Sequence, residues 1–394
     1  MLEQYMLERL EALKGQGMLR AITPKAQNAS EIEAGGERLI NLSSNDYLGL
    51  GHDKALAAEF AETLRGGGVL FSSSGSPLLT GAHPSAAAAA QACEALFPEK
   101  KCLFFNSGFA ANSGVISALG LIPGTVILAD KLIHASVIDG MTSDKRIRAL
   151  RFAHNDMESF ESVLCRAEQD SEQVIAVTEA VFSMDGDRAP LKELAALKRR
   201  HPKLRLYVDE AHSFGVYGEG GRGLCASEGV LEDADFILCT CGKALGSEGA
   251  FLLCSDTARS YFINTVRSLI FSTAISPVAF LHIAFMLKRL PNEEARRRRL
   301  SSICARVHEA VAQAGFPALS QSQIIPCLTG TNEKALKAAE FFKARGLYAM
   351  PIRHPTVPKG KARLRISLNA ALSDDEVSRL CKALLELKDQ NQEA

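Results

Sequence analysis

The stretch over residues 236–254 reads FILCTCGKALGSEGAFLLC and gives a first indication of the fold. It holds two apolar runs, FILC (236–239) and FLLC (251–254), joined by glycines and small residues. Continuous apolar runs of this length are typical of strands covered on both faces. Lys243 lies just past the first run. A lone lysine is usually solvated surface, but open α/β sheets bind ligands at strand ends, and a desolvated lysine can attack an aldehyde.

Five further apolar runs lie before this stretch and alternate with helical patterns. They are CLFF (102–105), TVIL (125–128), IRAL (147–150), VIAV (174–177) and LRLYV (204–208). Helices are expected between several of them, for example over 110–120, 157–168 and 191–200. Strands that alternate with helices predict a largely parallel α/β sheet.

The pattern changes after about residue 280. Long helical patterns over 280–289, 295–314, 333–345 and 374–388 surround short strands expected near 324–328, 347–352 and 363–368. Near the N-terminus, 2–14 reads as an amphipathic helix, and the run Ala86–Ala90 favours helix because alanine is the best helix former. We therefore expect an N-terminal helix and arm over 1–45, a large α/β domain over 46–280 and a smaller α+β domain over 281–394.

The charge balance excludes some classes of partner. The chain has 45 basic and 45 acidic residues, so its net charge is zero and nothing favours nucleic acid or an anionic membrane. The one basic cluster, Arg296–Arg299, is expected on a solvated helix face. The N-terminus lacks the apolar core of a signal peptide, and no apolar run reaches the ~18 residues of a membrane span.

The ten cysteines contain no CxxC pair. Several of them, including Cys93, Cys102, Cys165, Cys239 and Cys254, lie among apolar residues. This pattern indicates buried thiols in a reducing cytoplasm and favours neither a disulfide framework nor a metal site.

Three other segments carry polar or glycine-rich residues at predicted strand ends. Asp209 and His212 lie in LYVDEAH; Asp209 alone fits a helix cap equally well, but a buried carboxylate needs a partner such as a protonated pyridine nitrogen. The segment NSGFAANSGVISALG (106–120) opens a helix whose first N–H groups suit a phosphate. His134, in LADKLIHAS, fits a ring that stacks on an aromatic group or a structural hydrogen-bonder. All four signals fall at the strand ends of one inferred sheet.

These four pieces, in this order, resemble the fold-type-I pyridoxal-phosphate (PLP) enzymes and, more closely, the α-oxoamine synthase family. The resemblance runs from about Asn41 to Leu368. It is carried by NLSSNDYLGL (41–50), NSGFAAN (106–112), HAS (134–136), RFAHND (151–156), TEAVFSMDGDRAPL (178–191), VDEAHSFGVYGEGGRG (208–223), TCGKALG (240–246), FSTAISP (271–277) and RHPTVPKGKARLRISL (353–368). The family implies a PLP cofactor and the decarboxylative joining of an amino acid to an acyl thioester.

The resemblance also implies roles for single residues. Lys243 matches the Schiff-base lysine and general base, Asp209 the partner of the ring nitrogen, and His134 the stacking ring. The remaining cofactor positions are His212 and Ser183 near the ring 3-oxygen, Gly108, Phe109 and Thr240 at the phosphate, and Ser272 and Thr273, which reach the phosphate of the other subunit in a homodimer. The substrate positions are Arg365 for the amino-acid carboxylate, together with Asn45, Arg20 and Thr356, and His134, which also matches a contact to the carboxylate or the new ketone.

Within the family, RFAHND and RHPTVPKGKARLR look most like the biotin-pathway member, which implies L-alanine and a pimeloyl thioester as substrates. The carrier, coenzyme A or an acyl carrier protein, stays open, as does the partner of the distal carboxylate. Glycine-using members such as 2-amino-3-ketobutyrate CoA ligase or 5-aminolevulinate synthase, and an aminotransferase of the same fold, are alternatives. A catalytically silent partner subunit is another, but the presence of Lys243, Asp209 and His212 argues against it.

The chain departs from the family pattern at three places. Pro77 stands where an arginine or histidine is usual, and Ala86–Ala90 replaces a His-x-x-Leu-Glu pattern. Ser247 and Glu248 replace small residues after the lysine. These departures touch loop geometry and acyl-chain contacts, and they leave the proton chemistry unchanged.

Overall fold

The computed structural model describes residues 1–65 and 70–392. The chain forms two compact units. The large unit consists of Leu50–Ser183 and Asp187–Arg297, and the small unit of Met1–Gly49, Met184–Gly186 and Arg298–Ala394. The domain limits expected from the sequence remain a prediction; in the structure, the N-terminal arm and the C-terminal segment belong to one unit.

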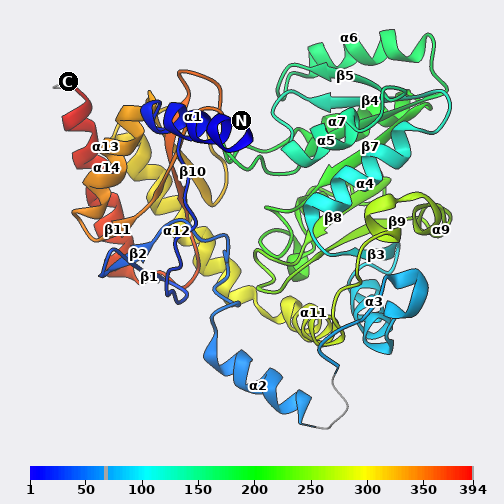
Figure 1. Ribbon diagram of the computed structural model, residues 1–394, viewed down its shortest axis with the longest axis horizontal. Helices are drawn as coiled ribbons and strands as arrows, with labels where there is room; N and C mark the ends of the chain where they lie inside the picture. The colour runs from blue at the N-terminus through cyan, green and yellow to red at the C-terminus, as the bar shows by residue number, and fades with distance from the viewer. Residues whose placement is uncertain (66–69, 393–394) are drawn as a thin grey trace. The chain divides into compact units, whose positions relative to one another are not determined.

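A seven-stranded sheet forms the core of the large unit (Figure 1). Its strands, in spatial order, are β3 (Lys101–Phe105), β9 (Ala250–Cys254), β8 (Phe236–Thr240), β7 (Leu204–Asp209), β6 (Gln173–Glu179), β4 (Thr125–Asp130) and β5 (Arg148–Phe152). Neighbours from β8 to β5 pair in parallel, whereas β9 is antiparallel to both β3 and β8. The seven predicted strands and the mostly parallel α/β class are confirmed.

Burial differs between the centre and the edge of this sheet. Every residue of β4 and of β9 is buried, as expected for strands covered on both faces. The prediction that IRAL (147–150) is covered in the same way is wrong: the first four residues of β5 are exposed. β5 is the edge strand, and its pairing within the described sheet is with β4.

Helices connect and flank the strands of the large unit. They are α2 (Lys54–Leu64), α3 (Pro84–Leu96), α4 (Gly108–Gly120), α5 (Ala135–Thr142), α6 (Met157–Glu168), α7 (Leu191–Arg200), α8 (Leu224–Ser227), α9 (Asp256–Thr265), α10 (Arg267–Ile270) and α11 (Pro277–Arg289), with short turns η1 (Pro77–Gly81), η2 (Glu219–Gly221) and η3 (Leu290–Asn292). The helical prediction for Ala86–Ala90 is confirmed by α3. Ser107, Asp156 and Ser276 cap α4, α6 and α11 with side-chain oxygens, which fixes where these helices begin.

Two further predictions are wrong. Arg297, expected in a solvated face, is buried, and its guanidinium donates to the carbonyls of Leu290 and Pro291 at 2.9 and 3.0 Å. These carbonyls lie at the end of the preceding helical turn. They accept hydrogen bonds from the Arg297 guanidinium, whose charge would otherwise be buried without partners. Cys165 is exposed on α6. All ten cysteines are free thiols.

The small unit contains two three-stranded sheets. One has the order β1 (Glu31–Ala34), β2 (Glu37–Asn41), β11 (Leu347–Tyr348), and the other β10 (Ile324–Gly330), β13 (Ala362–Ser367), β12 (Met350–Ile352). Its helices are α1 (Leu2–Gly15), α13 (Asn332–Lys343), α14 (Asp374–Gln392) and most of α12 (Glu294–Gln313), and α13 packs beside α14 (Figure 1). The predicted α+β texture is confirmed, with the expected strand 347–352 split in two. None of the helices within residues 1–65 and 70–392 is long and apolar enough to cross a bilayer.

Candidate active site

Lys243 lies in the loop between β8 and β9. Its Nζ lies 2.8 Å from Nε2 of His212, which is buried although it is 31 residues away in the sequence. The loop is closed on itself, because the N–H of Gly246 donates to the Lys243 carbonyl and that of Cys241 to the Gly249 carbonyl, both at 2.9 Å. The structure thus brings two of the predicted catalytic residues into contact.

Asp209, at the end of β7, belongs to a buried network that centres on Asn112 of α4. The Asn112 amide Nδ2 donates to Asp209 Oδ2 at 2.8 Å and to Ser136 Oγ at 3.0 Å. The Asn112 Oδ1 accepts from the Tyr207 hydroxyl at 2.8 Å. Ser136 Oγ lies 2.7 Å from Nδ1 of His134. Asp209 and His134 are therefore held at fixed positions by one chain of hydrogen bonds.

His134 caps α5. Its Nδ1 accepts the Ser136 N–H at 3.2 Å, so the other ring nitrogen, Nε2, carries the proton in the neutral ring. Protein atoms that crowd the ring lower the pKa of His134, Asp209 raises it, and Lys243 lowers it further, with a net shift downward. A neutral, capped ring suits the predicted stacking role.

The amino end of α4 is the cradle, the segment that the sequence analysis predicted to bind a phosphate. Ser107 caps the helix through the Ala110 N–H at 3.1 Å, and Gly108 is the first helical residue. A Cβ at Gly108 would lie only 2.7 Å from Cγ2 of Thr240, so glycine is required for the approach of this backbone. Phe109 is about half exposed beside it. A helix N-terminus with a threonine hydroxyl nearby fits the phosphate of PLP.

Ser183 follows β6, and its N–H donates to Glu179 Oε2 at 3.2 Å. Glu179, which the sequence did not single out, is buried next to Asp209 at the strand ends. Burial, the largest cause, and the charge of Asp209 raise the pKa of Glu179 to about 8. The strand ends of β6 and β7 therefore hold two carboxyl groups in place of the one predicted.

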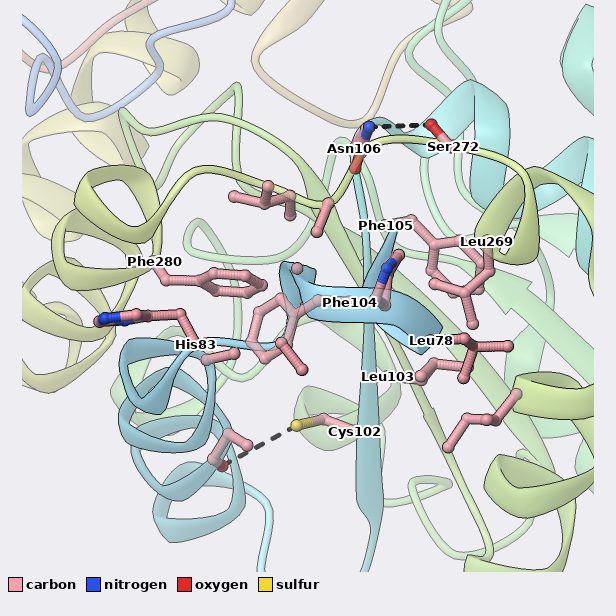
Figure 2. A pocket seen from close by; sticks show the side chains of 18 of the residues that line it. Leu78, His83, Cys102, Leu103, Phe104, Phe105, Asn106, Leu269, Ser272 and Phe280 are labelled. Atoms are coloured by element: carbon pink, nitrogen blue, oxygen red, sulfur yellow. Dashed lines mark hydrogen bonds between the residues drawn. The ribbon is translucent and has the colours of Figure 1, made fainter. Parts of the chain in front are cut away.

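Ser272 and Thr273 lie beside Asn106, which precedes the cradle. The Asn106 amide donates to Ser272 Oγ at 3.1 Å and to the Thr273 carbonyl at 2.6 Å (Figure 2). The three residues line one end of a largely apolar cavity of about 510 Å³. The cavity wall includes the aromatic side chains of Phe104 and Phe280.

Two of the departures from the family pattern line this same cavity. Pro77 lies on one wall, and Ala86, Ala87 and Ala90 of α3 lie on another. Their short side chains leave the space open. The third departure is separate from it: Ser247 Oγ lies 2.9 Å from Nδ1 of His282, and Glu248 is exposed.

The small unit brings four of the five predicted substrate residues together in two pairs; the fifth, His134, belongs to the large unit. Both terminal nitrogens of Arg365, on β13, donate to Asn45 Oδ1 at 3.3 Å, and Nη1 also donates to Ser367 Oγ at 2.7 Å. Arg20 Nη2 donates to Thr356 Oγ1 at 2.8 Å, although 336 residues separate the two in the sequence. The first pair is largely buried and the second is exposed.

The sequence analysis missed Asn112, Tyr207, Ser136, Asn106 and Glu179. Each is a single polar residue inside an otherwise apolar or small-residue segment, which gives no periodic signal. Asn112 lies within the quoted motif NSGFAAN, three residues from Phe109, and Ser136 lies within HAS, two residues from His134. Polar residues at that spacing, on a helix that starts at a strand end, are the signal that was available.

A mostly parallel seven-stranded sheet, with a lysine, a carboxylate and a helix N-terminus at its strand ends, defines a fold-type-I PLP transferase. The family described as aminotransferase class I and II matches residues 37–384, and the chain belongs to it. PLP is its cofactor. Similar proteins in the comparisons include several named 8-amino-7-oxononanoate synthase, and the chain is a PLP-dependent acyltransferase.

Individual relatives support this placement. The 8-amino-7-oxononanoate synthase of Haemophilus ducreyi is 39% identical over 387 residues, which cover 96% of this chain and 100% of that protein. The crystal structure of 8-amino-7-oxononanoate synthase from Francisella tularensis is 26% identical, with a TM-score of 0.75, covering 90% of this chain and 98% of that one. A serine palmitoyltransferase from S. paucimobilis with a bound PLP–myriocin adduct is also 26% identical, with a TM-score of 0.89, covering 99% and 98%.

Proposed function

We propose that this chain joins L-alanine to a pimeloyl thioester with loss of carbon dioxide, giving 8-amino-7-oxononanoate in biotin biosynthesis. The observation that carries the proposal is the likeness, over almost the whole chain, to proteins named for that product. The ten free thiols suit the reducing cytoplasm as the place of this reaction.

Lys243 and His212 form the proton-transfer pair of this proposal. PLP supplies an electron sink that stabilises negative charge at the α-carbon of the amino acid. Lys243 Nζ would hold the cofactor through its aldehyde carbon, and its free amine would remove the α-proton of the amino acid and later return a proton. His212, 2.8 Å from Nζ, orients the amine and contacts the ring 3-oxygen together with Ser183.

Asp209 faces the ring nitrogen and keeps it protonated. The two hydrogen bonds that Asp209 accepts, from Asn112 Nδ2 at 2.8 Å and from the Ala211 N–H at 2.9 Å, hold the carboxylate in place. His134 stacks on the ring from its cap position. Gly108, Phe109 and Thr240 bind the phosphate.

Arg365 binds the carboxylate of the amino acid. Its two terminal nitrogens already share one acceptor, the Asn45 Oδ1, so the fork is oriented before substrate arrives. Discrimination between alanine and glycine rests on one methyl group, worth about 1–3 kcal/mol, so glycine is expected to be a poor substrate.

Arg20 and Thr356 contact the acyl substrate. Each methylene buried on binding contributes ~0.8 kcal/mol, so a pimeloyl chain should clearly outcompete acetyl. The sequence and the contacts leave coenzyme A and an acyl carrier protein as equal choices of carrier.

The proposed enzyme is a homodimer in which Ser272 and Thr273 serve the other subunit's phosphate. Mixing a Lys243→Ala chain with a Thr273→Ala chain tests this. If Thr273 acts across the interface, one mixed site carries both lesions and the other carries neither, so activity partly returns. Lack of recovery despite proven subunit exchange would contradict the shared site.

The substrate assignment is tested by thiol release. Alanine, glycine and serine are each combined with acetyl, succinyl, pimeloyl and palmitoyl thioesters of both carriers. The expected optimum is alanine with pimeloyl. An optimum at glycine with acetyl or succinyl would replace this assignment by one of the glycine-using family activities and leave the Lys243 chemistry unchanged.

A further inference from the structure

Glu179 and Asp209 lie side by side at the ends of β6 and β7. They are direct partners in the parallel register, and the N–H of Ala180 donates to the Asp209 carbonyl at 2.9 Å. Their relative exposures are 3% and 5%, so both carboxyl groups are shielded from water. Two like charges this close in a buried place oppose each other, and one of the two groups is expected to hold a proton.

The hydrogen bonds of the two groups differ. Both oxygens of Asp209 accept, one from Asn112 and one from the Ala211 N–H. Glu179 Oε2 accepts the Ser183 N–H, but its Oε1 has no hydrogen-bond partner among the described residues. An ionised oxygen without a donor is costly to bury, whereas a protonated one carries no charge. The proton therefore belongs on Glu179.

The charged groups around Glu179 act in both directions. Its burial and the carboxylate of Asp209 favour the protonated form. Lys243 and the backbone N–H groups of Ser183 and His134 favour the ionised form. Protonation wins at neutral pH, because the resulting pKa of Glu179 is about 8.

We propose that Glu179 is a positioning residue of the cofactor site, protonated at Oε1 while Asp209 is ionised. It deepens the proposed site, in which Asp209 faces the ring nitrogen and Ser183 the 3-oxygen. Glu179 accepts the Ser183 N–H and is the register partner of Asp209, so it adjoins both residues that the proposed site assigns to the cofactor ring. Its Oε2 fixes Ser183, and its neutral charge leaves Asp209 as the negative member of the pair.

Infrared spectroscopy of the cofactor-free full-length protein tests the protonation directly. The difference spectrum of wild type minus Glu179→Gln at neutral pH should contain the carbonyl band of a protonated carboxyl group, and that band should disappear as the pH rises through about 8. If the difference contains ionised carboxylate bands at neutral pH, the proposal is overturned.

Glu210 provides the matched control. It is also fully buried, but its oxygens accept the N–H groups of Leu224 and Cys225 at 2.8 and 2.6 Å. Glu210→Gln should leave the Glu179 band and its titration midpoint unchanged. Loss of that same band in Glu210→Gln would assign the proton to Glu210 and overturn the proposal.

A second variant covers the case in which Glu179→Gln fails to fold. Asp209→Asn removes the neighbouring charge, so the band that titrates in wild type should shift its midpoint to lower pH; an unmoved midpoint would contradict the pairing. The dissociation constant of PLP should also change through this midpoint in wild type and stay flat there in Glu179→Gln. Both readouts are independent of the substrates, so they stand or fall separately from the proposed reaction.

Discussion

The Asn112 network in the large unit and the Arg20–Thr356 pair in the small unit hold predicted site residues in opposite ways. Asn112 is buried and links Asp209, Ser136 and Tyr207 through its single amide. Arg20 and Thr356 are exposed and share one hydrogen bond. The residues proposed for the cofactor, which stays bound through every turnover, are held in place by burial before any ligand binds. Those proposed for the acyl substrate depend on the substrate for most of their contacts.

The largest effect is expected at Lys243. Lys243→Ala should lower turnover by on the order of 10⁴-fold or more, because it removes both the nucleophilic amine and the base. PLP should still bind weakly, through the cradle and Asp209. Borohydride reduction followed by peptide mapping should label Lys243 in the wild type. Labelling of another lysine would show that the site is assigned wrongly.

Asn112→Ala breaks the network itself. It leaves the Tyr207 hydroxyl and one Asp209 oxygen without the partners they have at 2.8 Å, which should cost about 1–3 kcal/mol of unfolding free energy. Urea denaturation measures the loss, and PLP affinity should fall with it. Asn264→Ala, at an exposed helical asparagine with one backbone hydrogen bond, is the control and should change stability by less than about 0.5 kcal/mol. Equal effects of the two substitutions would contradict the role of burial.

The cluster of His154, Asp130 and Asp187 lies outside the contacts proposed for cofactor and substrate. It tests whether burial and charge also hold polar side chains in place there. The His154 ring nitrogens lie 2.8 Å from Asp130 and from Asp187, and despite partial burial these carboxylates raise the pKa of His154 to about 10. Because the folded pKa is raised, the stabilisation is complete below the ordinary histidine pKa and is lost as pH rises through about 10. His154→Gln should flatten the fall in melting temperature over that range; an unchanged pH profile would show that His154 is neutral.

The smallest effect on stability is expected at the exposed pair. Arg20→Ala should change unfolding free energy by no more than about 1 kcal/mol, yet lower kcat/KM for the acyl thioester while leaving PLP affinity unchanged. Lys25→Ala, at an exposed cation of the same arm, serves as the control. A loss of PLP affinity in Arg20→Ala would remove the contrast between the two regions.

The strands were predictable because a strand covered on both faces needs a continuous apolar run, and such runs are visible in the sequence. Lys243, Asp209 and His134 were noticed because they lie at or just past the ends of those runs within recognisable motifs, and their roles remain predictions. Asn112 gives a weaker signal: it lies within a quoted motif, but its partners Tyr207 and Asp209 lie 95 and 97 residues away, and a single polar residue has no period.

Burial at particular positions was equally hidden. The burial of Arg297 depends on carbonyls that only the folded turn presents, and the exposure of β5 depends on its place at the sheet edge. Sequence patterns report local preference. The burial of Arg297 and the exposure of β5 depend instead on which distant segments pack against them in the folded chain.

The reversed direction of β9 has a mechanical consequence for Lys243. Because β8 and β9 run in opposite directions, the segment between them leaves and re-enters the sheet at the same end of these strands. It is fastened by the hydrogen bond from the Cys241 N–H to the Gly249 carbonyl. Lys243 therefore lies on a loop that is held at both ends. The amine moves by rotation about the side-chain bonds of the lysine. The distance over which Nζ can move is therefore set by the length of one lysine side chain.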